Sequence, residues 1–392
     1  MSAPHESVER TAADRTAADR AAADHTAAGR KPSARPTTNL PTTDLPTVDF
    51  GRRLLRLDTR RLGLLVPVRT LVVCAVLVVV ILVVGVASMT IGAYDLGLGA
   101  VLRAVFDPAS DPDARQVVVE WRLPRVLFAV LCGAALALSG GIFQSLTRNP
   151  LGSPDIIGFG VGAQFGVTLV MIVLGHNTYG YKAAGAIVGG LVTALLVYAL
   201  ATKGTLSSFR LIIVGIGVSA GLGSLTSWIL VSVSVEQAMM AATWGAGSLA
   251  SLGFDQLVPA AVVLGVTVLV AVPLHRTLPV LEMGDDAATA LGISPGRTRF
   301  AAMIVGVMLV ALVTAAAGPI SFIALAAPQI CQRLTRSSTP MATASVMLTG
   351  AALVVVSDAT AQLLSVQVGV VTVSVGGLYL AWLLARQYRN RT

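Results

Sequence analysis

Few residues in this chain have the types and spacing that catalysis or metal binding would need. A phosphate-binding loop ends in Lys followed by Ser or Thr, but the three lysines, Lys31, Lys182 and Lys203, are followed by Pro, Ala and Gly. No HExxH motif occurs, and the three cysteines and four histidines are scattered, which favours a packing role for the cysteines. We therefore expect no enzyme activity, no cofactor and no metal site, and energy from ATP must come from a partner.

Acidic residues inside apolar segments would indicate a carrier driven by protons or sodium ions. Such carriers usually need carboxylates or histidines near the middle of their spans. Asp358 is the one acidic candidate that we identify, and we expect it at an outer helix end. This scarcity disfavours a stand-alone secondary transporter of a small solute and leaves it as the alternative.

The elements that carry these residues are apolar. Of the 392 residues, 55% are hydrophobic and 12% are charged, and the mean hydropathy is +0.78. A soluble domain carries about 25% charged residues, so lipid must solvate much of this chain. The formal net charge of +8 agrees with Lys and Arg gathering on the cytoplasmic side of a membrane. Basic runs interleaved with aromatics are missing, so we expect no nucleic-acid partner.

Residues 1–65 differ in composition from the remainder. Residues 11–30 form a five-residue near-repeat (TAADR, TAADR, AAADH, TAAGR), and residues 31–48 are rich in Pro and Thr. Few apolar residues are available there to offset the entropy of ordering. We therefore expect a disordered, low-complexity cytoplasmic arm over 1–65 and a transmembrane domain over 66–392.

Charge-free windows predict ten spans in that domain, because a charge near mid-bilayer costs about 2.5–3.5 kcal/mol. Gly318-Pro319 divides the longest window, and the weakly apolar piece 237–254 is left out because an eleventh span would put the C-terminal arginines outside. Both termini are then cytoplasmic. The windows are 70–94, 126–147, 156–181, 183–202, 211–235, 256–274, 300–332 (two spans), 337–357 and 359–385. The fold class expected is an all-α integral membrane bundle.

Several strings occur in a fixed order along this domain. They are RLPR (122–125), Ser139-Gly140, Gln144, RNPLGSP (148–154), GPISFIAL (318–325) and APQI (327–330). Over about residues 70–390 the chain resembles the FecCD-type permeases of ABC importers for iron-siderophore, haem and vitamin B12. The resemblance implies a ten-helix, type II permease in the cytoplasmic (inner) membrane. It also implies ABC ATPase subunits, an extracytoplasmic substrate-binding protein and a second permease copy or paralogue as partners.

The resemblance also implies residue roles at the two membrane faces. Arg122 and Arg125 are expected to dock the substrate-binding protein, because the guanidinium fork pairs bidentately with carboxylates; interfacial snorkelling is the alternative. The cytoplasmic gate is expected to comprise Asn149, Leu151, Ser208 and Phe209, with a plain helix-ending turn as the alternative at Pro150.

The long cytoplasmic loop 281–299 resembles the segment that couples such permeases to the ATPase. Asp285-Asp286 before Ala-rich residues predicts a short helix with acids at its N-terminal end. A merely solvated loop would have less reason to carry apolar residues. The coupling residues expected are Glu282, Met283, Gly284, Asp285, Asp286, Ala290, Leu291 and Gly292.

The chain also departs from the family pattern. Gln329 stands where many members have His, Gln362 where many have Arg, and Ser365-Val366-Gln367 where many have Glu-x-Pro. Contacts to the binding protein beyond Arg122 and Arg125 are therefore left open. The APQI string with Gly-Gly-Leu-Tyr at 376–379 favours an iron-siderophore chelate over haem or cobalamin.

Overall fold

Apolar runs form helices in this chain because a helix satisfies every backbone N–H and C=O within its own segment. The structure, a computed structural model, describes residues 54–59, 62–107, 111–203, 205–206, 208–250, 252–337 and 343–389. Seven helices in this described part are long and apolar enough to cross a membrane. They are Val68–Ser88 (α2), Pro112–Thr147 (α4, η1 and α5 in one run), Tyr179–Ala201 (α8), Ser208–Val231 (α9), Phe254–Glu282 (α11), Pro295–Ala317 (α13) and Thr343–Leu364 (α15).

Shorter helices complete the bundle. Two apolar ones are Phe159–Val173, made of α7 (Phe159–Thr168) and the π-helical η2 (Leu169–Val173), and α16 (Val368–Arg389). The others are α3 (Leu98–Phe106), α6 (Pro154–Ile157), α10 (Val235–Gly245), α12 (Asp285–Ala290) and α14 (Ile323–Thr335); within the long run, α4 is Pro112–Arg115, η1 is Gln116–Arg122 and α5 is Leu123–Thr147. The helical membrane fold is confirmed, whereas the count of ten spans stays a prediction.

Two small antiparallel hairpins accompany the helices. β1 (Leu54–Thr59) pairs with β2 (Leu62–Pro67), and β3 (Thr202–Lys203) pairs with β4 (Thr205–Leu206). The first hairpin falls at the end of the arm for which we expected disorder, in a leucine-rich stretch unlike the rest of that arm. Residues 1–53 lie outside the described residues, so disorder there and the boundary at residue 66 stay predictions.

Helix α5 lies at the centre of the core. Every residue from Cys132 to Thr147 is buried, and the surrounding helices are α11, α13, α14 and α15. A Cβ on Gly133 would collide with the carbonyl oxygen of Gly350 in α15, and one on Gly140 with that of Ala324 in α14. These glycines let α5 approach two neighbours backbone to backbone, as small residues do in lipid.

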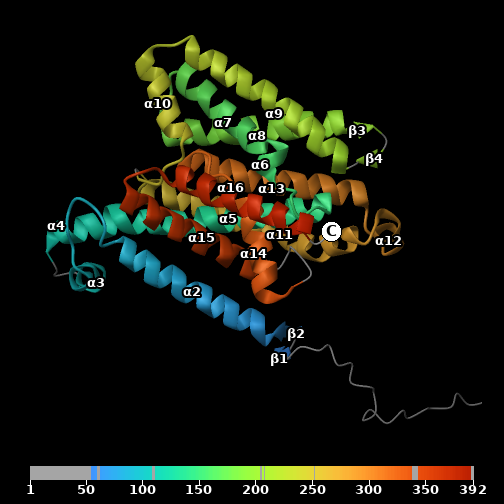
Figure 1. The fold of residues 1–392 in the computed structure, drawn as a ribbon, viewed down its shortest axis with the longest axis horizontal. Coiled ribbons are helices and arrows are strands. Elements are labelled where there is room, and N and C mark those ends of the chain that lie inside the picture. Colours follow the sequence, from blue (N-terminus) through green and yellow to red (C-terminus); the bar gives the residue numbers. More distant parts are fainter. Residues whose placement is uncertain are drawn as a thin grey trace, which may run out of the picture. The chain divides into compact units, whose positions relative to one another are not determined.

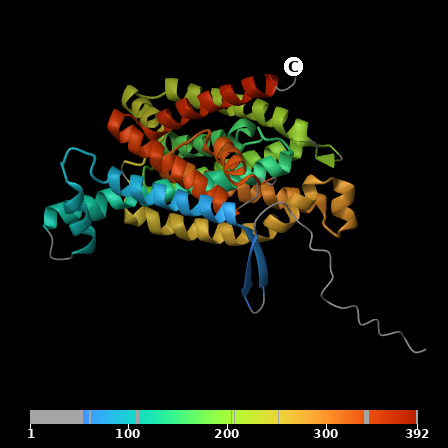
Figure 2. The ribbon, with the colours of Figure 1, turned by 60° about the horizontal axis from the view of Figure 1, so that its bottom comes forward.

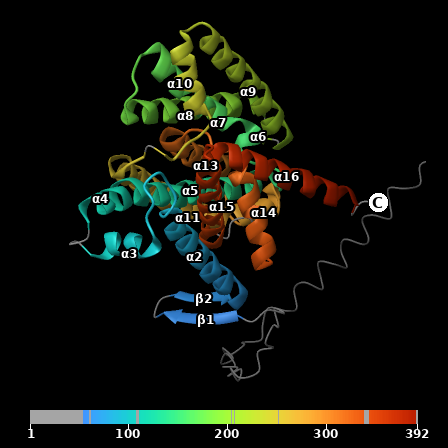
Figure 3. The ribbon, with the colours of Figure 1, turned by 60° about the vertical axis from the view of Figure 1, so that its left-hand side comes forward.

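Helices α7, α8, α9 and α10 form a group beside α13, visible in two views (Figures 1 and 3). Close packing through glycines is present between α7 and α8, where a Cβ on Gly166 would collide with the carbonyl oxygen of Gly185. It is not present for Gly217 and Gly221 of α9, where a Cβ would meet no atom of the described chain within 4 Å.

The helix boundaries near the C-terminus also differ from the predicted windows. The break at Gly318-Pro319 is confirmed, since α13 ends at Ala317 and α14 begins at Ile323. The predicted boundary at Asp358 is wrong, because α15 continues through this residue to Leu364. A charge inside a helix is tolerated when it is paired, and Asp358 is paired with Arg125. Helices α3 and α4 lie at one end of the bundle and α12 at the other (Figures 1 and 2).

Candidate functional site

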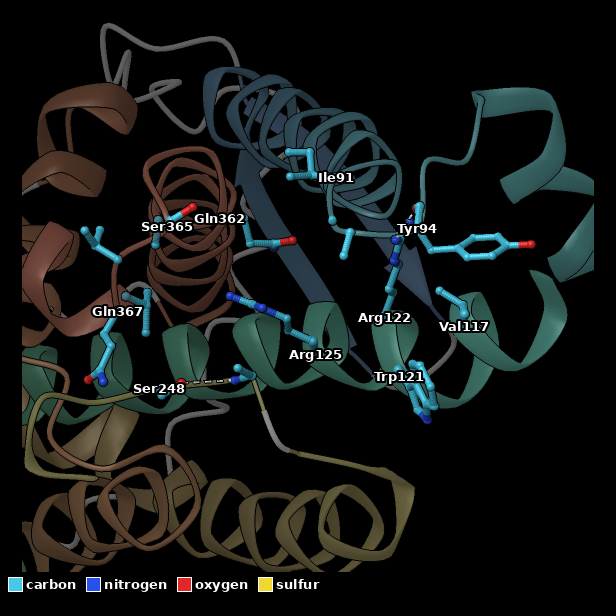
Figure 4. Close-up of a pocket in the computed structure, with 16 residues that line it drawn as sticks. Ile91, Tyr94, Val117, Trp121, Arg122, Arg125, Ser248, Gln362, Ser365 and Gln367 are labelled. Carbon is cyan, nitrogen blue, oxygen red and sulfur yellow. Dashed lines mark hydrogen bonds between the residues drawn. The ribbon is translucent and has the colours of Figure 1, made fainter. Parts of the chain in front are cut away.

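A cavity of about 660 Å³ opens at the end of the bundle that carries α3 and α4. Its walls are the loop after α2, the η1–α5 helix, residues 248 and 250, and the turn between α15 and α16. Arg122 and Arg125 both line it, with Tyr94 and Trp121 nearby and Gln362 opposite (Figure 4). We call it the arginine cavity. The structure thus brings the two predicted docking residues together.

Arg122 forms hydrogen bonds with the loop that follows α2. Its Nη1 donates to the carbonyl oxygen of Met89 at 2.5 Å, and its Nη2 donates to that of Tyr94 at 2.7 Å. No hydrogen-bond partner for its Nε occurs within the described residues. Among the described residues, the guanidinium therefore has only neutral backbone acceptors at hydrogen-bond distance, while the carboxylate of Asp95 acts on its charge from farther away.

Arg125 is bound to a carboxylate of its own chain. Its Nε lies 2.9 Å from Asp358 Oδ2 and its Nη2 lies 2.9 Å from Oδ1, and the Nε2 of Gln362 donates to Oδ2 at 2.9 Å. The Asp358 side chain is 3% exposed and that of Arg125 is 21% exposed. The sequence analysis missed this partner because the two residues are 233 positions apart.

A second cavity, of about 90 Å³, lies where the chain breaks between α13 and α14. Asp155, Gln164, Thr314 and Ser321 contribute polar side chains to its wall. Oδ2 of Asp155 accepts a hydrogen bond from the backbone N–H of Phe322 at 3.1 Å, just before α14. Asp155 thus binds the start of a half-length helix. It escaped notice because it stands one position before the charge-free window 156–181.

A third cavity, of about 230 Å³, lies at the C-terminal end of α5. We call it the carboxamide cavity, because four amide side chains line it together with Arg148, Pro150 and Glu282: Gln144, Asn149, Gln329 and Gln332. Gln329 Nε2 donates to Gln144 Oε1 at 2.8 Å, and Gln144 Nε2 donates to the carbonyl oxygen of Leu325 at 3.0 Å. The cavity therefore joins a predicted gate residue to the predicted coupling loop.

The predicted gate residues are only partly brought together. Asn149 Oδ1 accepts from the N–H of Leu151 at 2.9 Å, which closes a tight turn after α5. Arg148, the residue that ends α5, has a φ of 50°. Ser208 and Phe209 begin α9 and do not line the carboxamide cavity, and Phe209 is 72% exposed. A gate made by all four residues stays a prediction.

The predicted coupling loop contains the expected short helix. Helix α11 ends at Glu282, and α12 follows with Asp285 and Asp286 in its first turn. Gly284 and Gly292 bracket it with φ values of 127° and 77°, which L side chains rarely adopt. Met283 is 73% exposed and Leu291 is 66% exposed. These two apolar side chains therefore stand on the surface on either side of α12.

Asp285 forms what we call the Asp285 bridge with Arg148 and Arg299, although its own side chain stays 42% exposed. Its Oδ1 lies 2.8 Å from Arg148 Nη2 and 2.6 Å from Arg299 Nη2, and its Oδ2 lies 2.9 Å from Arg299 Nη1. The hydrogen bonds from Arg299 lower the pKa of Asp285 below its usual 3.8; partial burial opposes this, and Arg148 adds to the lowering. The sequence analysis identified Asp285 but neither arginine partner.

Neither a metal site nor a hydrolase nucleophile emerges from the described residues. No group of three or more His, Cys, Asp or Glu residues able to hold a metal ion occurs among them. Residues 217–221 match the letters GxSxG, but Ser219 lies inside α9 and its hydroxyl donates to the carbonyl oxygen of Gly215 at 2.6 Å. A hydrolase elbow instead places its serine on a sharp turn between a strand and a helix.

Known proteins resemble this chain along most of its length. Residues 78–386 match the model of the FecCD transport family. The ferric enterobactin transport system permease protein FepG of Escherichia coli (strain K12) is 45% identical, over 82% of this chain and 98% of that protein. Its FepD counterpart is 32% identical over 77% and 92%, and the Fe(3+) dicitrate transport system permease protein FecD of the same strain is 33% identical over 69% and 85%.

A solved structure has a similar fold. It is described as an inward-facing conformation of a metal-chelate type ABC transporter, with a TM-score of 0.71 and 27% sequence identity, over 80% of this chain and 98% of that one. The family model and this fold both cover the helical body that holds the three cavities. This chain is a member of the FecCD transport family.

Proposed function

We propose that this chain is the transmembrane permease subunit of an ABC importer that carries an iron-siderophore chelate across the cytoplasmic membrane. The observation that carries the proposal is the 45% identity to a ferric enterobactin permease along 98% of that protein. The relatives compared above are named for ferric enterobactin and ferric dicitrate. Iron chelates are therefore favoured over haem or cobalamin.

ATP hydrolysis belongs to separate ABC ATPase subunits in this account. The coupling loop supports their docking through the exposed side chains of Met283 and Leu291, because burying large apolar side chains in a partner's cleft favours association. Glu282, Asp286, Ala290 and Gly292 complete the proposed contact, and Gly284 sets the turn. A second permease copy or paralogue would supply the other half of the pathway.

The arginine cavity is the proposed dock for the substrate-binding protein. Arg122 keeps its Nε and Arg125 its Nη1 without a hydrogen bond to any described residue, so both can still donate to an acidic partner. Arg122 carries the larger unbalanced charge, because Asp358 neutralises Arg125. This side of the bundle is then extracytoplasmic. The α12 end, toward which the C-terminal end of α16 also lies (Figure 1), is cytoplasmic, and we place both chain termini there.

Transport in this account consists of alternating closure of two ends without covalent chemistry. The Asn149–Leu151 turn, with Ser208 and Phe209, forms the cytoplasmic gate. Closure of the ATPase pair displaces the coupling loop and changes the shape of the carboxamide cavity, whose wall contains both Asn149 and Glu282.

Growth on defined iron sources tests the substrate. The strain lacking this gene is grown with one ferric siderophore, ferric dicitrate or haem as the sole iron source, with and without the gene restored on a plasmid. We expect growth to fail on a ferric siderophore, to recover with the restored gene and to continue on haem. Failure on haem with normal growth on every chelate would overturn the iron-siderophore assignment.

A further inference from the structure

Two consecutive helices, α12 and α13, and the distant helix α5 meet at the carboxylate of Asp285. Arg148 terminates α5, Asp285 begins α12, and Arg299 lies in the first turns of α13. Arg148 is 137 residues from Asp285, and its Nη2 also donates to the carbonyl oxygen of Leu281 at 2.6 Å. The inner end of α5 is thus connected to both sides of the turn between α11 and α12.

The burial of Arg299 makes its pairing with Asp285 costly to break. The Arg299 side chain is only 10% exposed, whereas those of Arg148 and Asp285 are 39% and 42% exposed. Loss of Asp285 would leave the Arg299 guanidinium buried without its carboxylate, which is strongly unfavourable. Because two arginines share one carboxylate, a displacement of α12 moves their guanidinium groups or strains short hydrogen bonds.

A displacement of Arg148 would also move the turn that Asn149 and Leu151 form after α5. Asn149 follows Arg148 directly, and its side chain receives the N–H of Leu151. Arg148 also adopts a φ of 50°, a conformation that a non-glycine residue keeps only when its surroundings hold it. The Asp285 bridge is one of those surroundings.

We propose that the Asp285 bridge transmits motion of the coupling loop to the inner end of α5, so that Asp285 is a positioning residue and not an ATPase contact. The inference rests on the proposed coupling function of residues 282–292. It gives the side chain of Asp285 an ion-pairing role within the permease and leaves the contact with the ATPase to Met283, Leu291 and their exposed neighbours.

The test uses the whole importer in proteoliposomes and three permease variants. Asp285→Asn removes the charge at the centre of the bridge, and Arg148→Gln removes only the link to α5. Arg297→Gln is the control, because Arg297 is exposed and has no hydrogen bond or ion pair among the described residues. The measurements are the amount of ATPase that copurifies with the permease, ATP hydrolysis stimulated by loaded binding protein, and chelate uptake.

We expect Asp285→Asn and Arg148→Gln to retain the ATPase but to import about tenfold less chelate per ATP hydrolysed, the scale of a typical coupling between sites. Arg297→Gln should match the parent. The double variant should be no worse than Asp285→Asn alone, because both changes break one connection. Unchanged uptake per ATP in both single variants would overturn the proposal. So would loss of the ATPase from Asp285→Asn, since Asp285 would then be a docking residue.

Two variants distinguish failure of this inference from misfolding and from failure of the proposed coupling function. If Asp285→Asn does not accumulate in the membrane, Arg148→Gln carries the test, because it leaves the Asp285–Arg299 pair intact. Met283→Asp with Leu291→Asp tests the underlying coupling function, and undiminished copurification of the ATPase would contradict ATPase docking at this loop. Uptake per ATP in Arg148→Gln still reports on the bridge in either case.

Discussion

Arg125 and Asp358 form a bidentate ion pair that connects α5 to α15, with two N···O distances of 2.9 Å. Gln362, one turn after Asp358, donates a further hydrogen bond to the same carboxylate. The sequence assigned Arg125 to a partner protein, whereas the structure gives it a partner within the chain. The arginine cavity therefore has one guanidinium in an ion pair and one, that of Arg122, with no carboxylate at hydrogen-bond distance in the described part of the chain.

The ion pair predicts that loss of Arg125 and loss of Asp358 destabilise the protein by different amounts. Arg125→Gln leaves the almost fully buried Asp358 charged, and breaking a buried pair costs about 3–5 kcal/mol. Asp358→Asn should cost less, because the Arg125 side chain is 21% exposed and its charge can reach water. Thermal unfolding in detergent measures the order, and the double variant Arg125→Gln with Asp358→Asn should be more stable than Arg125→Gln alone. Equal midpoints for the two single variants would contradict this account.

Docking of the substrate-binding protein should depend mainly on Arg122. Arg122→Glu reverses a charge that no carboxylate of the described residues balances at hydrogen-bond distance, so we expect affinity for the binding protein to fall by about tenfold or more. The difference in affinity between this variant and the parent should shrink as added salt screens the charges. Titration of labelled binding protein onto the reconstituted importer measures it.

Arg103→Glu serves as the control for that experiment, because Arg103 also lies in the α3–α4 region but does not line the arginine cavity. The affinity of the Arg103→Glu importer for the binding protein should stay close to that of the parent. An unchanged affinity for Arg122→Glu, or an equal loss for both variants, would refute the assignment of Arg122 to docking.

Local patterns predicted the helical body well, because charge-free length is a property of a single segment. The break after Ala317 followed from Gly318-Pro319, and the short helix α12 followed from Asp285-Asp286 before alanines. The boundary placed at Asp358 failed because a charge was taken to end a span. Its tolerance inside α15 depends on Arg125, 233 residues away, which no local window contains.

The same limitation applies to the candidate site. Residue types identified Asp285 and Asn149, but the contacts that connect them run through Arg148. The side chain of Arg148 contacts Asp285, which is 137 residues away in the sequence. Asp155 was missed because the windows were chosen to exclude charges. Its role at the start of α14 becomes visible only once the N–H of Phe322 is placed beside it.

The turn after α5 should depend on an acceptor at position 149. Asn149→Ala removes the oxygen that receives the N–H of Leu151, a hydrogen bond worth about 1 kcal/mol. Asn149→Asp retains an acceptor and is the matched control. If the turn belongs to the cytoplasmic gate, passive leakage of chelate from loaded proteoliposomes without ATP should rise about fivefold for Asn149→Ala and little for Asn149→Asp. Equal leakage from Asn149→Ala and the parent would remove this turn from the gate.

The Asp285 bridge should be insensitive to pH over the physiological range. The pKa of Asp285 is lowered in the folded protein from 3.8, so its stabilising contribution is present above that value and is lost only as pH falls through the lower folded value. Chelate uptake per ATP should therefore show no bridge-dependent step between about pH 5.5 and 8.

Arg148→His should introduce such a step. A histidine has a pKa of about 6.5, which a neighbouring carboxylate raises. Its link to Asp285 would exist below that pKa and be lost as pH rises through it. Uptake per ATP should then decline with rising pH in the variant but not in the parent, and parallel profiles for the two proteins would contradict the bridge.

The central claim is that this chain forms a pathway and takes its driving force from an ATPase. The direct test is uptake of a radioactive iron chelate into proteoliposomes that contain the permease and the second permease subunit. The proteoliposomes are prepared with or without the ATPase, and uptake is driven either by ATP or by a proton gradient. We predict uptake only when the ATPase, ATP and loaded binding protein are all present. Uptake by the permease without any ATPase, driven by the proton gradient alone, would contradict the account.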